Sequence, residues 1–101
     1  MSGESHEAGS ALDAARDRVI EGVDIYVAGV DDRIETDRRL TVQETAGGRW
    51  VGSIDANLAS YSDVQLEVQL PDGISPPRAT FVVGPRFRGA TLIRGVGPPP
   101  R

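Results

Sequence analysis

Few side chains in this sequence can take part in acid–base or nucleophilic chemistry. Its 101 residues contain no cysteine and no lysine, and the single histidine, His6, lies in a small, polar N-terminal segment. Histidine-based catalysis requires an imidazole held rigidly beside a partner, and transition-metal sites usually need the same ligand. The remaining candidates are carboxylates and tyrosines, of which Glu67, Tyr26 and Tyr61 stand in or near apolar runs. Strand alternation places Glu67 and Asp24 toward solvent, although either could instead face a cavity.

No stretch of the sequence has the spacing of a metal or cofactor site. The acidic cluster Asp31, Asp32, Glu35 and Asp37 lacks the alternate ligand positions and the glycine turn of a calcium loop. The glycines of residues 95–97 lead into prolines, whereas a phosphate-binding loop leads into a helix N-terminus. We therefore expect no metal and no cofactor.

Aromatic and arginine side chains are the best candidates for a binding site. Trp50, the single tryptophan, follows two glycines and is either the aromatic wall of a ligand pocket or an anchor of the core. Arginines near strand ends would orient anionic or carbonyl groups, with Arg86 and Arg94 assisting. The predicted ligand-binding residues are Arg49, Trp50, Phe81, Phe87 and Arg88.

The charge distribution is uneven and argues against nucleic acid as a partner. The formal net charge is −4, and the acidic residues gather in the first half of the chain. A nucleic-acid-binding domain usually carries a concentrated basic face, which this sequence lacks. No apolar run is long enough to span a bilayer, and the N-terminal segment does not have the pattern of a secretory signal. These features predict a cytoplasmic protein without membrane contact.

The rhythm of apolar residues changes at Val23. Residues 1–9 are predicted to be a mobile tail, and residues 10–101 a single β-rich domain that begins with a short helix over residues 11–21. From Val23 onward the apolar residues recur at every second position, in six runs separated by glycine, proline and acidic turns. Six such strands must curl to cover their apolar face. The expected fold is mainly β, a small antiparallel β-barrel or β-roll of about six strands with one short N-terminal α-helix.

The last residues, with glycines at 95 and 97 and prolines at 98–100, are predicted to close the sheet. Proline offers no amide donor, so such a segment discourages further strand pairing. The alternative is a polyproline ligand for an aromatic groove on another protein.

The turn motifs resemble those of a known family. Pro85, Gly89, the Gly95-Val96-Gly97 stretch and Pro99-Pro100, together with the hairpin at residues 48–52, are similar to the ending and hairpin of domain-of-unknown-function family 4873. This small actinobacterial family is often fused to flavin-dependent monooxygenases of the Baeyer-Villiger type. The resemblance spans about residues 23–100 and implies an all-β accessory domain linked with oxidative metabolism. It implies no catalytic residues.

Three hypotheses about function follow. The first is a noncatalytic accessory or binding module for a small apolar molecule or for a partner enzyme such as a monooxygenase. The second is a small β-barrel cyclase or isomerase of specialised metabolism, which works by positioning in a closed pocket beside Tyr26, Tyr61 or Glu67. The third is a structural homo-oligomer that pairs through its sheet edges.

Overall fold

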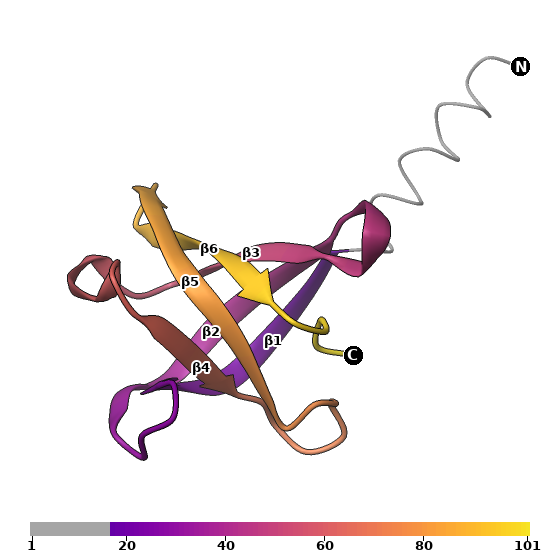
Figure 1. The fold of residues 1–101 in the computed structure, drawn as a ribbon, viewed down its shortest axis with the longest axis horizontal. Coiled ribbons are helices and arrows are strands. Elements are labelled where there is room, and N and C mark those ends of the chain that lie inside the picture. The colour runs from indigo at the N-terminus through magenta and orange to yellow at the C-terminus, as the bar shows by residue number, and fades with distance from the viewer. Residues whose placement is uncertain (1–16) are drawn as a thin grey trace, which may run out of the picture.

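The computed structural model describes residues 17–101, which form a closed antiparallel barrel of six strands (Figure 1). The strands are β1 (Asp17–Val27), β2 (Arg33–Glu44), β3 (Trp50–Ile54), β4 (Gln65–Gln69), β5 (Arg78–Phe87) and β6 (Ala90–Val96). Two short 3-10 turns, η1 (Ala46–Gly48) and η2 (Ala59–Tyr61), lie in the loops after β2 and β3. The period-two runs thus form a small β-barrel, which is the first of the two folds expected from the sequence.

The strand order around the barrel is β1-β2-β3-β6-β5-β4. The chain forms two three-stranded meanders, β1 to β3 and β4 to β6, and residues 55–64 connect them. The pairs β3–β6 and β1–β4 then close the barrel, whereas a single rolled meander would pair its first strand with its last. Closure of this kind removes the open sheet edges that promote aggregation.

The prediction of a helix over residues 11–21 is wrong for residues 17–21, the part that the structure describes. Residues 17–21 belong to β1, in which Val19 and Ile20 lie opposite Thr41 and Leu40 of β2. Val19 is exposed and Ile20 is buried, so their side chains alternate as in a strand and do not share a helical face. Gly22, the residue after the expected helix, has φ +73° at an irregularity in the β1–β2 register. The remainder of that helix and the tail at 1–9 lie outside the described residues.

Apolar side chains from every strand fill the interior of the barrel. Burying them is the main favourable contribution to folding of a domain of this size. The buried hydrophobic residues are Ile20, Val23, Ile25, Leu40, Val42, Trp50, Ile54, Ala56, Leu58, Leu66, Val68, Leu70, Ala79, Phe81 and Ile93.

Thr91 of β6 holds the connection between the two meanders against the barrel. Its hydroxyl donates a hydrogen bond to the carbonyl oxygen of Ala56 at 2.6 Å and accepts one from the amide of Leu58 at 3.1 Å. Thr91 is completely buried, so the two hydrogen bonds satisfy polar groups that water cannot reach.

The C-terminal segment, residues 97–101, folds back along one end of the barrel. Pro99 and Pro100 are buried, and the main chain of Arg101 exchanges two hydrogen bonds of 2.9 Å with that of Ser75. The guanidinium of Arg18 donates to the carbonyl oxygen of Pro100 at 3.1 Å, and Arg101 forms an ion pair with Glu44 at 3.0 Å. The segment therefore closes the barrel end through packing and hydrogen bonds. The prediction from the sequence relies only on the absence of an amide donor in proline.

Candidate functional site

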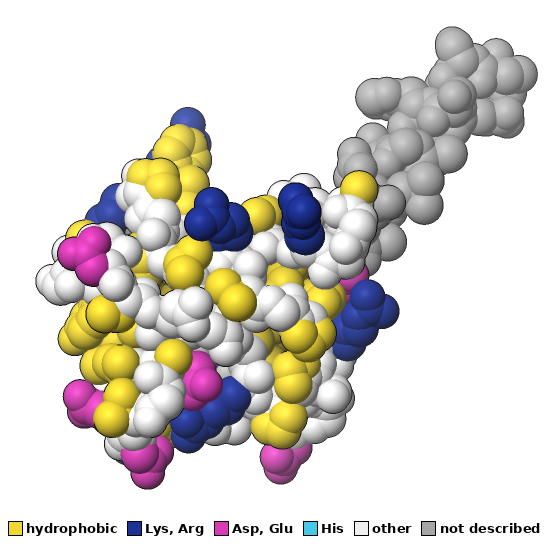
Figure 2. Space-filling model, viewed as in Figure 1, with side chains coloured by type: hydrophobic (Ala, Val, Ile, Leu, Met, Phe, Trp, Pro, Cys, Tyr) yellow, Lys and Arg dark blue, Asp and Glu magenta, His cyan; other side chains and the backbone are white. Residues whose placement is uncertain are grey.

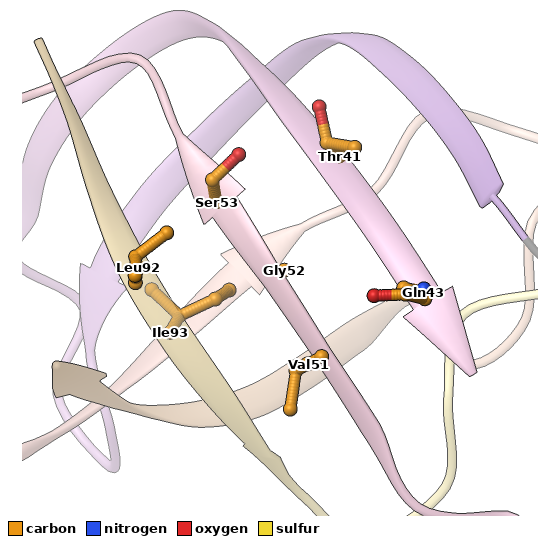
Figure 3. A pocket seen from close by; sticks show the side chains of 7 residues that line it. All are labelled: Thr41, Gln43, Val51, Gly52, Ser53, Leu92 and Ile93. Carbon is orange, nitrogen blue, oxygen red and sulfur yellow. The ribbon is translucent and has the colours of Figure 1, made fainter. Parts of the chain in front are cut away.

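A hollow of about 390 Å³, the central hollow, lies on the outside of the barrel over β3. Figure 3 shows Thr41 and Gln43 of β2 on one side, Leu92 and Ile93 of β6 on the other, and β3 with Val51 and Ser53 between them. The alternation that turns Ile54 and Trp50 inward turns Val51 and Ser53 outward. The hollow is mainly apolar and has hydroxyl and amide groups on its rim.

A second hollow of about 620 Å³, the end hollow, adjoins the first because Val51 lines both. It lies between the loop before β3 and the last residues of β6, and we call the two hollows together the β3 groove. Arg94 is directly opposite Val51 in the β3–β6 ladder. Its backbone therefore lies where the two hollows meet, and its side chain lines the end hollow. The residues that line the end hollow are Thr45, Arg49, Trp50, Val51, Arg94, Gly95 and Gly97.

Trp50 is one of the residues that line the end hollow, and its indole ring packs against Gly95. A Cβ atom at Gly95 would come within 2.0 Å of the indole Cε2 and 2.1 Å of Nε1, so only glycine fits opposite the ring. Trp50 is 1% exposed, and its Nε1 has no hydrogen-bond acceptor in the described part of the chain. Buried donors of this kind are rare in folded proteins because each one costs free energy.

The arginines of the barrel fall into two groups. Those in the first group form ion pairs: Arg33 with Asp24, Arg38 with Glu35, Arg39 with Glu21, Arg78 with Asp31 and Glu67, and Arg101 with Glu44. Those in the second group form no ion pair with any residue in the range 17–101: Arg18, Arg49, Arg86, Arg88 and Arg94. Of these, Arg18 donates a hydrogen bond to the carbonyl oxygen of Pro100. Figure 2 shows arginine side chains along the upper part of the face in view, and others at its right side and in its lower part, where most of the acidic side chains lie.

The five predicted ligand-binding residues occupy three different places. Arg49 and Trp50 line the end hollow together, with Trp50 also serving as a core anchor. Phe81 is fully buried in the core and faces Gly95 across the β5–β6 ladder. Phe87 and Arg88 lie at the turn between β5 and β6, beyond the opposite end of β6 from the end hollow. The structure thus brings two of the five together.

Several residues of the β3 groove were not among the predicted ones. Val51, Leu92 and Gln43 are outward-facing strand residues, whose type gives no sign of a site. Their closeness to Arg94 across the β3–β6 ladder could have indicated these residues, but it is known only once β3 and β6 are known to pair. Strands that are distant in the sequence can be paired in many ways, so the sequence alone does not show this neighbourhood.

The candidate acid–base residues lie elsewhere: Tyr61 is in η2 and packs against the core, and Asp24, Tyr26 and Glu67 are on the outer surface where β1, β4 and β5 meet. Arg78 lies over the ring of Tyr26 at 4.2 Å and pairs with Glu67 at 3.3 Å. Arg33 pairs with Asp24 at 3.3 Å. Within residues 17–101, no group of three or more histidines, cysteines or acidic residues is arranged to hold a metal ion. This surface has the features of a satisfied ion-pair network that spans the β1–β4 closure.

Comparison with known proteins gives no significant match: no family model matches the sequence, no curated protein matches it, and no solved structure matches its fold. From residue 17 to residue 101 the chain contains no helix of the length and apolar character needed to cross a membrane. The fold and the groove therefore define the protein only as a six-stranded antiparallel β-barrel with an arginine-flanked groove on its outer face.

Proposed function

We propose that this chain is a noncatalytic binding module, and that its ligand is a small molecule with an apolar body and an anionic group. The observation that carries the proposal is the pair Arg49 and Arg94, which lack ion-pair partners among residues 17–101 and flank a hollow next to apolar Val51 and Leu92. Five other arginines of the barrel, Arg33, Arg38, Arg39, Arg78 and Arg101, are paired with carboxylates. Arginines without such a partner can bind an external anion.

Each of the two hollows suits a different part of the proposed ligand. A carboxylate fits the planar guanidinium groups of Arg49 and Arg94, which donate paired hydrogen bonds. An apolar body would lie in the central hollow against Val51 and Leu92, where its burial is favourable. Thr41, Gln43 and Ser53 on the rim offer hydroxyl and amide groups that could orient it.

The noncatalytic assignment rests on the side chains that line the β3 groove. None of those residues is an acid, a histidine, a cysteine or a tyrosine. General acid–base catalysis needs such a group within hydrogen-bond reach of the reacting atoms. The alternative of a barrel enzyme receives less support, because Glu67 and Tyr26 both interact with Arg78 on the outer surface.

The resemblance to family 4873 suggests a biological setting for this module. We propose that it serves a flavin-dependent monooxygenase as an accessory domain in the cytoplasm, which would make the ligand a substrate or product of oxidative metabolism. An all-β barrel is in keeping with that role. Binding of the protein to a monooxygenase encoded beside it, measured by light scattering, would support the proposal, and a mixture that stays separate would count against it.

Octanoate, which has an apolar chain and a carboxylate, tests the binding proposal. Its binding can be followed by fluorescence because Trp50 is the only tryptophan of the chain and lines the end hollow. Octanoate should change the Trp50 fluorescence and shift the amide resonances of Gly52 and Gly95, and octanol should bind more weakly. Substituting Arg94→Gln or Arg49→Gln should weaken octanoate binding about tenfold, since a charge-assisted hydrogen bond is lost.

The matched control is Arg33→Gln, which removes an exposed arginine that is paired with Asp24 and does not line the groove. It should leave octanoate affinity unchanged. Equal affinity for octanol and octanoate, or equal loss in all three variants, would show that the groove does not select an anion.

A further inference from the structure

The turn that joins β5 to β6 extends beyond the rest of the barrel (Figure 1). We call residues 84–90 the hairpin tip. β5 pairs with β4 only as far as Val82, and β6 pairs with β3 only from Thr91 onward. Phe87 and Ala90 therefore pair only with each other, and residues 85–89 are all exposed.

Phe87 presents an aromatic ring to solvent at the hairpin tip. It is 56% exposed, whereas Trp50 and Phe81 are buried. The guanidinium of Arg88 lies over its ring, 5.2 Å from the ring centre, so the two side chains are presented together. An exposed aromatic ring that adds nothing to the core is typical of the anchor residue of an interface.

Arg88 occupies a backbone position that does not suit arginine. Arg88 has φ +53° and Gly89 has φ +81°, so both residues of this two-residue turn are in the left-handed region. Turns of this type favour asparagine followed by glycine, because asparagine tolerates positive φ better than arginine does. An unfavourable residue at such a position suggests that its side chain serves a purpose other than folding.

Arg86 and Arg88 form no ion pair with residues 17–101, which leaves two positive charges at the hairpin tip, one of them over the exposed ring. Aromatic and arginine side chains are the residues that most often dominate protein–protein binding energy. The chain as a whole has a net charge of −4, and this would oppose its approach to an anionic membrane. A protein partner with a small acidic patch would meet only the positively charged tip and not the acidic remainder of the barrel.

We propose that the hairpin tip is a docking element for another protein, which presents an apolar pocket rimmed by carboxylates. Phe87 enters the pocket, and Arg86 and Arg88 pair with the carboxylates. This inference is independent of the β3 groove, because the end hollow and the tip lie at opposite ends of β6.

The test places the photocrosslinking residue p-benzoylphenylalanine at position 87 of the full chain, in the cells from which the chain comes. Val30, which is 52% exposed in the turn between β1 and β2, is the matched position for a control. The proposal expects a crosslink at position 87 to one protein, at a peptide that contains apolar residues flanked by aspartate or glutamate. Arg86→Glu with Arg88→Glu should lower the yield about tenfold, and reversing the partner's acidic residues should restore it.

Arg88→Asn separates docking from folding. Asparagine suits the turn, so this variant should be at least as stable as the natural protein while its crosslinking yield falls. Crosslinking to lipid or to a second copy of this chain, yields no higher than at position 30, or a yield that the Arg88 substitutions leave unchanged would each overturn the proposal.

Discussion

The contact between Trp50 and Gly95 shows how one small residue shapes both the core and the groove. Gly95 lacks the Cβ atom that would overlap the indole, and both residues line the end hollow. The glycine at position 95 is needed for space, since its φ is not among the positive values of the barrel glycines. A tryptophan packed in this way has little room to move, so the hollow above it is preorganised for a ligand.

We therefore predict that Gly95→Ala destabilises the barrel by about 1–3 kcal/mol, because the added methyl group overpacks a closed core. The free energy of unfolding, measured in urea by Trp50 fluorescence, checks this value. Val96→Ala is the control, since Val96 is 40% exposed and its truncation should cost little. An equal effect of the two substitutions would mean that the indole can move away from position 95.

At the scale of elements, the C-terminal segment behaves as part of the barrel. It joins three other parts of the chain, through Ser75 in the loop before β5, Arg18 of β1 and Glu44 of β2. The first residues of β1 pair with β2 but not with β4, because the β1–β4 ladder begins only at Asp24. The buried prolines thus complete the end of the barrel at which strand pairing stops.

The burial of Pro100 and the exposure of Pro98 provide a matched pair of substitutions in this segment. Pro100→Ala should lower the free energy of unfolding by about 1–2 kcal/mol, because it removes roughly two buried methylene groups. It should also speed hydrogen exchange at the Ser75 amide, which donates to Arg101. Pro98→Ala should change neither quantity, and similar effects from both substitutions would show that the segment does not cap the barrel.

At the scale of the whole molecule, the two meanders share a single core. Residues from β1 to β3 and from β4 to β6 belong to one buried cluster, and Thr91 of β6 binds the segment that connects the meanders. Neither meander can cover its apolar face without the other, so neither should fold alone.

We predict that urea unfolding is a single cooperative transition. Trp50 fluorescence, which reports on the end of β3 and β6, should give the same midpoint as far-ultraviolet circular dichroism, which reports on all strands. Hydrogen exchange of the slowest amides in β1 and β5 should give the same free energy. Two separated midpoints would instead indicate that one meander persists after the other has unfolded.

The sequence by itself determined the approximate strands from Val23 onward, the turns between them and most of the inward side chains; β6, in which Ile93 is buried and Leu92 is exposed, is an exception. These features are local: alternation decides which residues can share a face, and glycine, proline and aspartate end each run. The same local reasoning was wrong at Val19 and Ile20, whose spacing fits both a helix and a strand. These residues form a strand and not a helix because they pair with β2. A local pattern does not contain information about such a distant partner.

Only the tertiary structure decided the strand order, the place of Arg49 and Arg94 beside an apolar hollow, and the burial of the last prolines. Each depends on pairs that are distant in the sequence: β3 with β6, β1 with β4, and Arg101 with Ser75. Many pairings of six short strands would bury the same apolar residues. The one that forms is selected by how the side chains pack once the barrel closes, and that is a property of the whole chain.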